Sequence, residues 1–85
     1  MHALAVKTDG VVVSPLRLID EKTGLYAHFK AFLNGIDECD CLAFGLLGIE
    51  IMRVLSVSDQ LELEGMLYIL PDNSRRLYVF EIITK

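Results

Sequence analysis

Aromatic and basic side chains gather at alternate positions in the stretch from Gly24 to Leu33. Because neighbouring side chains of a β-strand point to opposite faces, one face would carry Tyr26, His28, Lys30 and Phe32. Rings that stack on bases, combined with cations that contact phosphates, are typical of proteins that bind single-stranded nucleic acid. The high β propensity of Tyr and Phe explains the same residues without a ligand. Both interpretations stay open on this stretch alone.

The other set of alternate positions in this stretch is apolar throughout and is predicted to face the core: Leu25, Ala27, Phe29, Ala31 and Leu33. The segment from Cys39 to Gly45 predicts a second strand. One of its faces is small and apolar, with Cys39, Cys41 and Ala43, and the other carries Asp40, Leu42 and Phe44. The carboxylates of Glu38 and Asp40 would repel a phosphate chain.

Catalytic and metal chemistry find little support in the sequence. Only His2 and His28 could serve as bases near neutral pH, and no Ser or Cys nucleophile is placed for His28. Cys39 and Cys41 lack the second pair of ligands that a zinc site needs, and a strand would turn both thiols into the core. We therefore expect neither an enzyme, nor a metal site, nor a cofactor.

Composition limits the class of protein. The 85 residues predict one domain, whose first ten residues form an extra strand or a flexible segment. The net charge of −4 argues against binding of nucleic acid by charge alone. No apolar run approaches a membrane span, and two cysteines make no disulfide framework, so we expect a cytoplasmic protein. An apolar fraction of 53% in so short a chain favours a homo-oligomer.

The C-terminal third predicts a bent hairpin. Leu61 and Leu63 alternate with Glu62 and Glu64, which indicates a strand with one buried face. Gly65 interrupts the pattern, as expected for a bulge or a sharp bend. A turn over residues 71–74 leads to a last strand over residues 75–84, where both alternating sets are mostly apolar and the buried face is undecided.

The N-terminal part leaves two alternatives open. Asp9-Gly10 either turns a hairpin after Ala3–Val6 or lies at a bulge in one long strand. An extra strand over Ala3–Val6 would suit dimer contacts. Between the second predicted strand and the hairpin, Leu46 to Val57 predicts a helix that turns Leu47, Ile51, Val54 and Leu55 to the core.

The order of these elements resembles the single-stranded-DNA-binding protein family of OB folds. The resemblance rests on Ala43-Phe44-Gly45, the helix after it, the stretch Asp59 to Leu67 and the strand Gly24 to Leu33, and it covers the chain from about Val11. It implies an all-β, five-stranded OB barrel with one helix between strands three and four. It also implies a first barrel strand over Val11 to Ile19.

The resemblance further implies single-stranded nucleic-acid binding in replication, recombination or repair, with DNA favoured over RNA. Bases would stack on Tyr26, Phe32, Phe44 and Tyr68. Phosphates would contact Arg17, Lys30, Arg75 and Arg76, and His28 would add a hydrogen bond or a stack. Family members commonly form dimers or tetramers, and many have an acidic tail, which we do not expect after Lys85.

A second hypothesis belongs to another class of function. The acidic charge, the apolar helix and the apolar last strand suit an OB-fold interaction subunit that builds a nucleoprotein or replication complex through protein partners. Such a subunit would hardly touch nucleic acid itself. Gel filtration with and without an oligonucleotide distinguishes the two hypotheses.

Overall fold

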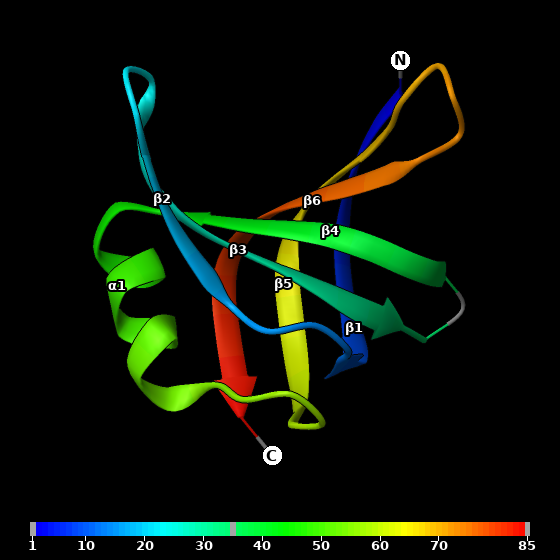
Figure 1. The fold of residues 1–85 in the computed structure, drawn as a ribbon. Coiled ribbons are helices and arrows are strands. Elements are labelled where there is room, and N and C mark those ends of the chain that lie inside the picture. Colours follow the sequence, from blue (N-terminus) through cyan, green and yellow to red (C-terminus); the bar gives the residue numbers. More distant parts are fainter. Residues whose placement is uncertain (1, 35, 85) are drawn as a thin grey trace.

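The computed structural model describes residues 2–34 and 36–84. Within them the elements follow in the order β1 (His2–Val12), β2 (Arg17–Glu21), β3 (Gly24–Leu33), β4 (Ile36–Phe44), α1 (Gly45–Val54), β5 (Gln60–Ile69) and β6 (Arg75–Thr84). The strands are arranged in the order β1-β5-β6-β4-β3-β2, and an additional pairing of β1 with β3 closes the sheet (Figure 1). The pairs are antiparallel except for β4 and β6, which run parallel.

The predicted OB barrel is confirmed. Strands β1, β3, β4, β5 and β6 form the closed barrel, and β2 extends the sheet along β3. The helix α1 lies between β4 and β5, which are the third and fourth strands of the barrel. Among the described residues, no helix is long and apolar enough to cross a membrane.

The N-terminal segment forms one long strand instead of a hairpin. β1 pairs with β5 in an unbroken register from His2 to Val11, straight through Asp9-Gly10. Gly10 lies where β1 also meets β3, and a Cβ there would be 2.8 Å from Leu33 Cδ2. Tight packing therefore explains this glycine, and no turn is needed.

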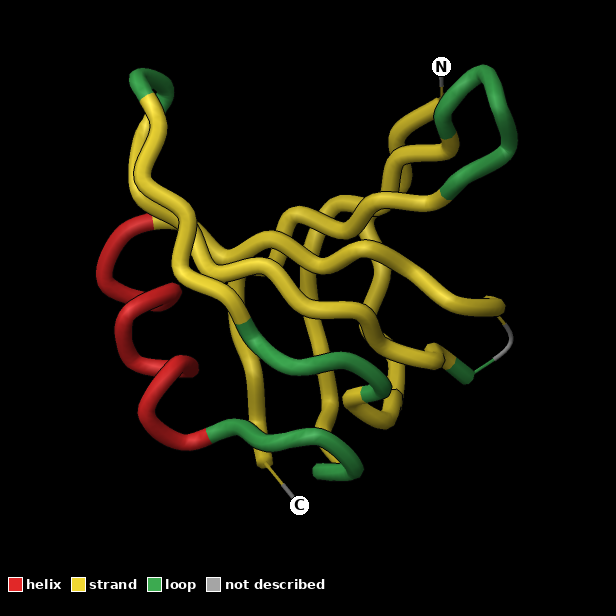
Figure 2. Tube along the Cα trace, viewed as in Figure 1, coloured by secondary structure: helices red, strands yellow, loops and turns green. Residues whose placement is uncertain are grey.

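The predicted first barrel strand over residues 11–19 is wrong as a single strand. A loop at residues 13–16 separates β1 from β2, and Figure 2 shows it as a green segment between two yellow strands. Pro15 cannot donate to a sheet ladder. The chain departs there, and Ser14 Oγ accepts a hydrogen bond of 2.7 Å from the Lys30 backbone N–H.

The core has the faces that strand alternation predicts. Four of the five apolar residues predicted on the inner face of β3 have an exposed fraction of 1% or less: Ala27, Phe29, Ala31 and Leu33. β4 adds its three small inner residues, Cys39, Cys41 and Ala43. The rest of the inner layer comes from β5, β6 and β1, with Leu61, Leu63, Leu67, Leu77, Val79 and Val12.

The bend predicted at Gly65 is also confirmed. The register between β5 and β6 shifts at Glu64/Gly65, so that Gly65 pairs with Val79 and Glu64 with Glu81. Phe80 is the extra residue of this bulge. A Cβ at Gly65 would clash with the Tyr78 carbonyl group, because the two strands approach closely where they bend.

The helix is shorter than predicted and is rotated relative to the prediction. It ends at Val54, and Ile51 and Leu55 join the core while Leu47 and Met52 pack against it. Val54 is 57% exposed, so its predicted place in the core is wrong. Gly48 is instead one of the buried residues of α1, because the absence of a side chain lets the helix approach the backbone of Ala27.

Candidate nucleic-acid interface

Strand pairing brings the predicted site together on the outer face of β3, β4, β6 and β5. Tyr26 pairs with Phe44 across β3 and β4, and Leu42 pairs with Tyr78 across β4 and β6. The next row joins Asp40 to Arg76, and Arg76 to Tyr68 of β5. We call this surface the aromatic face: Tyr26, His28, Lys30, Asp40, Leu42, Phe44, Met66, Tyr68, Arg76 and Tyr78.

Four rings form a continuous row on the aromatic face. The centroids of Tyr26 and Phe44 lie 5.0 Å apart, and those of Phe44 and Tyr78 lie 5.9 Å apart. Tyr78 and Tyr68 then meet edge to face at 5.2 Å. These spacings are typical of favourable aromatic pairs. The row presents ring surface from four different strands.

One end of the row is fixed by a carboxylate. The Tyr26 hydroxyl donates a hydrogen bond of 3.3 Å to Glu21 Oε1. Partial burial and the nearby Glu21 charge raise the pKa of Tyr26 above its usual value of 10.0. The raised pKa widens the pH range above neutrality over which the phenol stays uncharged.

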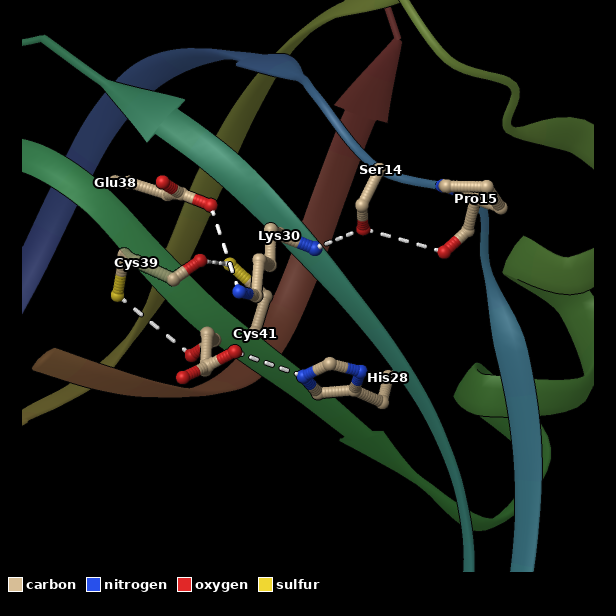
Figure 3. A network of polar contacts seen from close by, with 8 residues as sticks. Ser14, Pro15, His28, Lys30, Glu38, Cys39 and Cys41 are labelled. Carbon is tan, nitrogen blue, oxygen red and sulfur yellow. Dashed lines mark hydrogen bonds and ion pairs between the residues drawn. The ribbon is translucent and has the colours of Figure 1, made fainter.

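Ionic contacts link β3 to β4 beside the rings. His28 Nε2 lies 2.9 Å from Asp40 Oδ1, and Lys30 Nζ lies 3.7 Å from Glu38 Oε1. Figure 3 shows these contacts side by side along the two strands. The Lys30 ammonium is thus partly neutralised by Glu38, and the His28 ring is held by Asp40. This neutralisation weakens the attraction of this part of the face for a phosphate chain.

The two arginines of β6 point apart. Arg76 lies on the aromatic face, whereas strand alternation turns Arg75 away from it. Arg75 lines a separate polar hollow of about 210 Å³ with Lys30, Glu38 and Asp40 at the end of the barrel. Arg76 therefore lies on the aromatic face itself, and Arg75 adjoins the face at this hollow, beside Lys30 and Asp40.

Two other predicted residues lie at the margins of the face. Arg17 pairs with His28 from the outer strand β2. Phe32, 55% exposed, pairs with Glu38 and with Val11 at the far end of β3. It lines a hollow of about 360 Å³ with Val11 and Leu61 and is absent from the ring row.

The structure adds Tyr78, which the sequence analysis did not select. Its ring joins Phe44 to Tyr68, and with Tyr68, Leu70 and Arg76 it lines a hollow of about 370 Å³. The pairing of β6 with β4 was the missing information, because the alternation of residues 75–84 left the outer face undecided. The available signal in the sequence was that Tyr78 follows Arg76 by two positions, which places both side chains on the same face of a strand.

The cysteines face the core, as predicted. Cys39 and Cys41 are both buried, and their thiols lie close enough to interact. The hydrogen bond from Cys41 lowers the pKa of Cys39, while the same bond and burial raise that of Cys41. Neither thiol contributes to the aromatic face.

No family model matches the chain. A search of curated proteins likewise finds no match. The fold is nevertheless shared with solved structures. The small single-stranded DNA-binding protein of Streptomyces coelicolor superposes with a TM-score of 0.87 at 16% identity, covering 100% of this chain and 95% of that one.

Two other structures share the same architecture. The mitochondrial single-stranded DNA-binding protein of S. cerevisiae gives a TM-score of 0.80 at 10% identity, over 99% of this chain and 95% of that one. The single-stranded DNA-binding domain of a Synechococcus sp. protein gives 0.66 at 19% identity, over 96% and 93%. At these identities the likeness shows the OB fold of the chain.

Proposed function

We propose that this protein binds single-stranded nucleic acid on its aromatic face. The observation that supports this proposal most directly is the row of Tyr26, Phe44, Tyr78 and Tyr68 across four strands. Successive bases stack on such rings, each contributing about 1–3 kcal/mol. The structures with the same fold come from single-stranded DNA-binding proteins, which agrees with this assignment.

Phosphate contacts come from cations at the edges of the row. Arg76 borders the Tyr68–Tyr78 hollow, and Arg17 and Lys30 flank His28 on either side. With a net charge of −4 on the chain, these local cations do not create a basic surface. Stacking therefore supplies most of the affinity, and the salt dependence is shallower than that of a basic groove.

The first test measures fluorescence anisotropy of a labelled oligo-dT, with oligo-dU as a base-matched second probe and oligo-U as an RNA probe. We expect saturable binding of oligo-dT that weakens moderately with salt, since few phosphates are neutralised. Tighter binding of the deoxy chains would support DNA and a role in replication, recombination or repair. Absence of binding at tens of micromolar protein would overturn the proposal and favour the interaction subunit.

We also propose that the protein forms a homo-oligomer through β1. Within the described part of the chain, residues 3–6 of β1 have a strand neighbour on one side only, which is β5. Leu4 in this stretch is largely exposed. Such an edge pairs readily with a second copy, and a lysine on it opposes pairing.

Light scattering tests this association. We expect the wild-type mass to be at least that of a dimer, and the variant Leu4→Lys to have the mass of a monomer. Thermal unfolding of the variant checks that β1 still pairs with β5. A monomeric wild-type protein would contradict the proposal.

A further inference from the structure

The aromatic face contains one carboxylate, Asp40, and a second, Glu38, borders it, although a surface built only for phosphate would have neither. Glu38 and Asp40 lie on the outer side of β4, in line with Leu42 and Phe44. Each opposes phosphate electrostatically, so neither improves general binding of a nucleic-acid backbone. A carboxylate that is unfavourable for the backbone can still be favourable for the edge of a base.

Asp40 is held in a fixed position. Its Oδ1 lies 2.9 Å from His28 Nε2, and the His28 side chain is only 18% exposed. The Asp40 side chain itself remains 38% exposed. One side of the carboxylate is therefore anchored to the sheet, and acceptor capacity remains for a ligand because a carboxylate accepts about four hydrogen bonds.

The position of Asp40 relative to the rings suits contact with a stacked base. Asp40 pairs with Arg76 and Leu42 pairs with Tyr78, so Asp40 and Tyr78 are diagonal neighbours. Diagonal neighbours in a sheet lie about 7–8 Å apart, within reach of long side chains and their ligands. A base stacked on Tyr78 would present one edge to Asp40 and Arg76.

The hydrogen-bonding groups of this pair distinguish guanine from thymine and uracil. Guanine has an acceptor, O6, beside two donors, N1–H and the 2-amino group. Arginine donates to O6 of guanine, and a carboxylate accepts from the two donors. Thymine and uracil place a carbonyl oxygen on each side of their single N–H, and these oxygens would face the carboxylate unfavourably.

We infer that Asp40, together with Arg76, makes the aromatic face selective for guanine over thymine. This inference rests on the proposed function, since it concerns a base stacked on Tyr78. Asp40 is a specificity-determining residue that contacts the base edge, and His28 positions its carboxylate. A contact of this quality discriminates between bases by roughly 5- to 150-fold.

The experiment uses thymine oligonucleotides of about 16 nucleotides, the upper site size of one OB fold. A second set carries single guanines separated by thymines, which prevents quadruplexes, and a third replaces each guanine by inosine, which lacks the 2-amino group. We expect guanine guests to tighten binding at least fivefold over thymine. We expect inosine to lose part of that gain.

The variant Asp40→Asn keeps the size of the side chain and reduces the guanine preference to near unity. Glu62→Gln is the matched control, because Glu62 also pairs with a cation, Lys7 at 3.5 Å, but lies outside the aromatic face. It should leave the preference unchanged. A preference that persists in Asp40→Asn would overturn the assignment to Asp40.

Two further outcomes separate this inference from the proposed function. Equal binding of all three oligonucleotides by the wild-type protein overturns the guanine selectivity and leaves the stacking function intact. Absence of binding to every oligonucleotide overturns the stacking function itself, and the selectivity falls with it. If Asp40→Asn fails to fold, a guanine-to-inosine ratio near unity in the wild-type protein still overturns the proposed contact of Asp40 with the 2-amino group.

Discussion

The two ends of the β5–β6 hairpin present surfaces of different chemical character to solvent. On the side of the bulge nearer the turn, their outer residues belong to the aromatic face, including Tyr68, Arg76 and Tyr78. On the other side, the outward positions of β5 and β6 are Glu62, Glu64, Glu81 and Ile83, and β1 adds Lys7 and Asp9. We call this second surface the acidic face.

The comparison shows that an acidic protein can concentrate its negative charge on one surface and leave another surface rich in aromatic rings. Glu64 and Glu81 face each other directly across β5 and β6, whereas the pair at the other end is Tyr68 with Arg76. The bulge at Gly65 lies between these two pairs and bends both strands. Net charge therefore describes the whole chain, while the local arrangement of rows decides what each surface can bind.

The largest expected effect comes from removing rings of the row. Phe44→Ala and Tyr78→Ala should each weaken binding of oligo-dT by about 5- to 150-fold, since stacking contributes about 1–3 kcal/mol per base. The measurement is anisotropy at fixed salt.

Phe80→Ala is the control for these ring variants. Phe80 is an aromatic residue of the same strand as Tyr78 and is 62% exposed, but it lies in the bulge and is not one of the four rings of the row. We expect its removal to leave affinity unchanged. An equal loss in Phe80→Ala would show that the two surfaces do not differ as described.

The border between the surfaces is tested by Gly65→Ala. The new Cβ would collide with the Tyr78 carbonyl group, and overpacking of this kind costs about 1–3 kcal/mol. Urea unfolding should show the loss of stability. Gly45→Ala is a useful contrast, because nothing lies within 4 Å of a Cβ there and only its positive φ of 63° opposes the change. A fully stable Gly65→Ala would contradict the close approach at the bulge.

The salt dependence should change with Arg76 and not with a distant cation. Arg76→Gln should lower the slope of log affinity against log salt by about 0.7, the value for one phosphate of a single strand. Arg53→Gln on α1 removes the same charge away from the face and should leave the slope as it is. Equal slopes in all three proteins would exclude a phosphate contact at Arg76.

The smallest effect concerns the acidic face. Glu81→Gln removes one of two like charges that lie directly opposite each other, and such pairs destabilise a sheet by about 0.2–1 kcal/mol. We expect a small rise in thermal stability at low salt that disappears at high salt. Lower stability at low salt would indicate a favourable contact of Glu81 instead.

The parts predicted correctly from the sequence depend on local alternation. The buried set of β3 followed from apolar residues at every second position, and the bend followed from a glycine inside a strand pattern. The last strand was undecided for a physical reason. Leu77 and Val79 point inward before the bulge, and Ile82 packs on the core after it. The bulge at Phe80 reverses the alternation, so neither set alone faces the core.

What could not be predicted depends on pairing between distant strands. The row became visible only when β6 was placed beside β4, which brought Tyr78 next to Phe44. The side on which Arg75 points follows from the same register. Likewise, nothing local indicated that Val54 would be exposed. The helix packs against the barrel at Gly48, where the lack of a side chain allows close contact with the backbone, and Val54 then lies on the solvent side.

The parallel pairing of β4 with β6 has a consequence for folding. It joins only residues 40–42 to residues 76–78, which are far apart in the chain, and contacts of this kind form slowly because they close long loops. Phe44 belongs to β4 and Tyr78 to β6, the two strands that this pairing joins. The aromatic face is therefore complete only when the barrel is closed. By linkage, a ligand at a hundred times its Kd would raise the free energy of unfolding by about 2.7 kcal/mol and so oppose separation of β4 from β6.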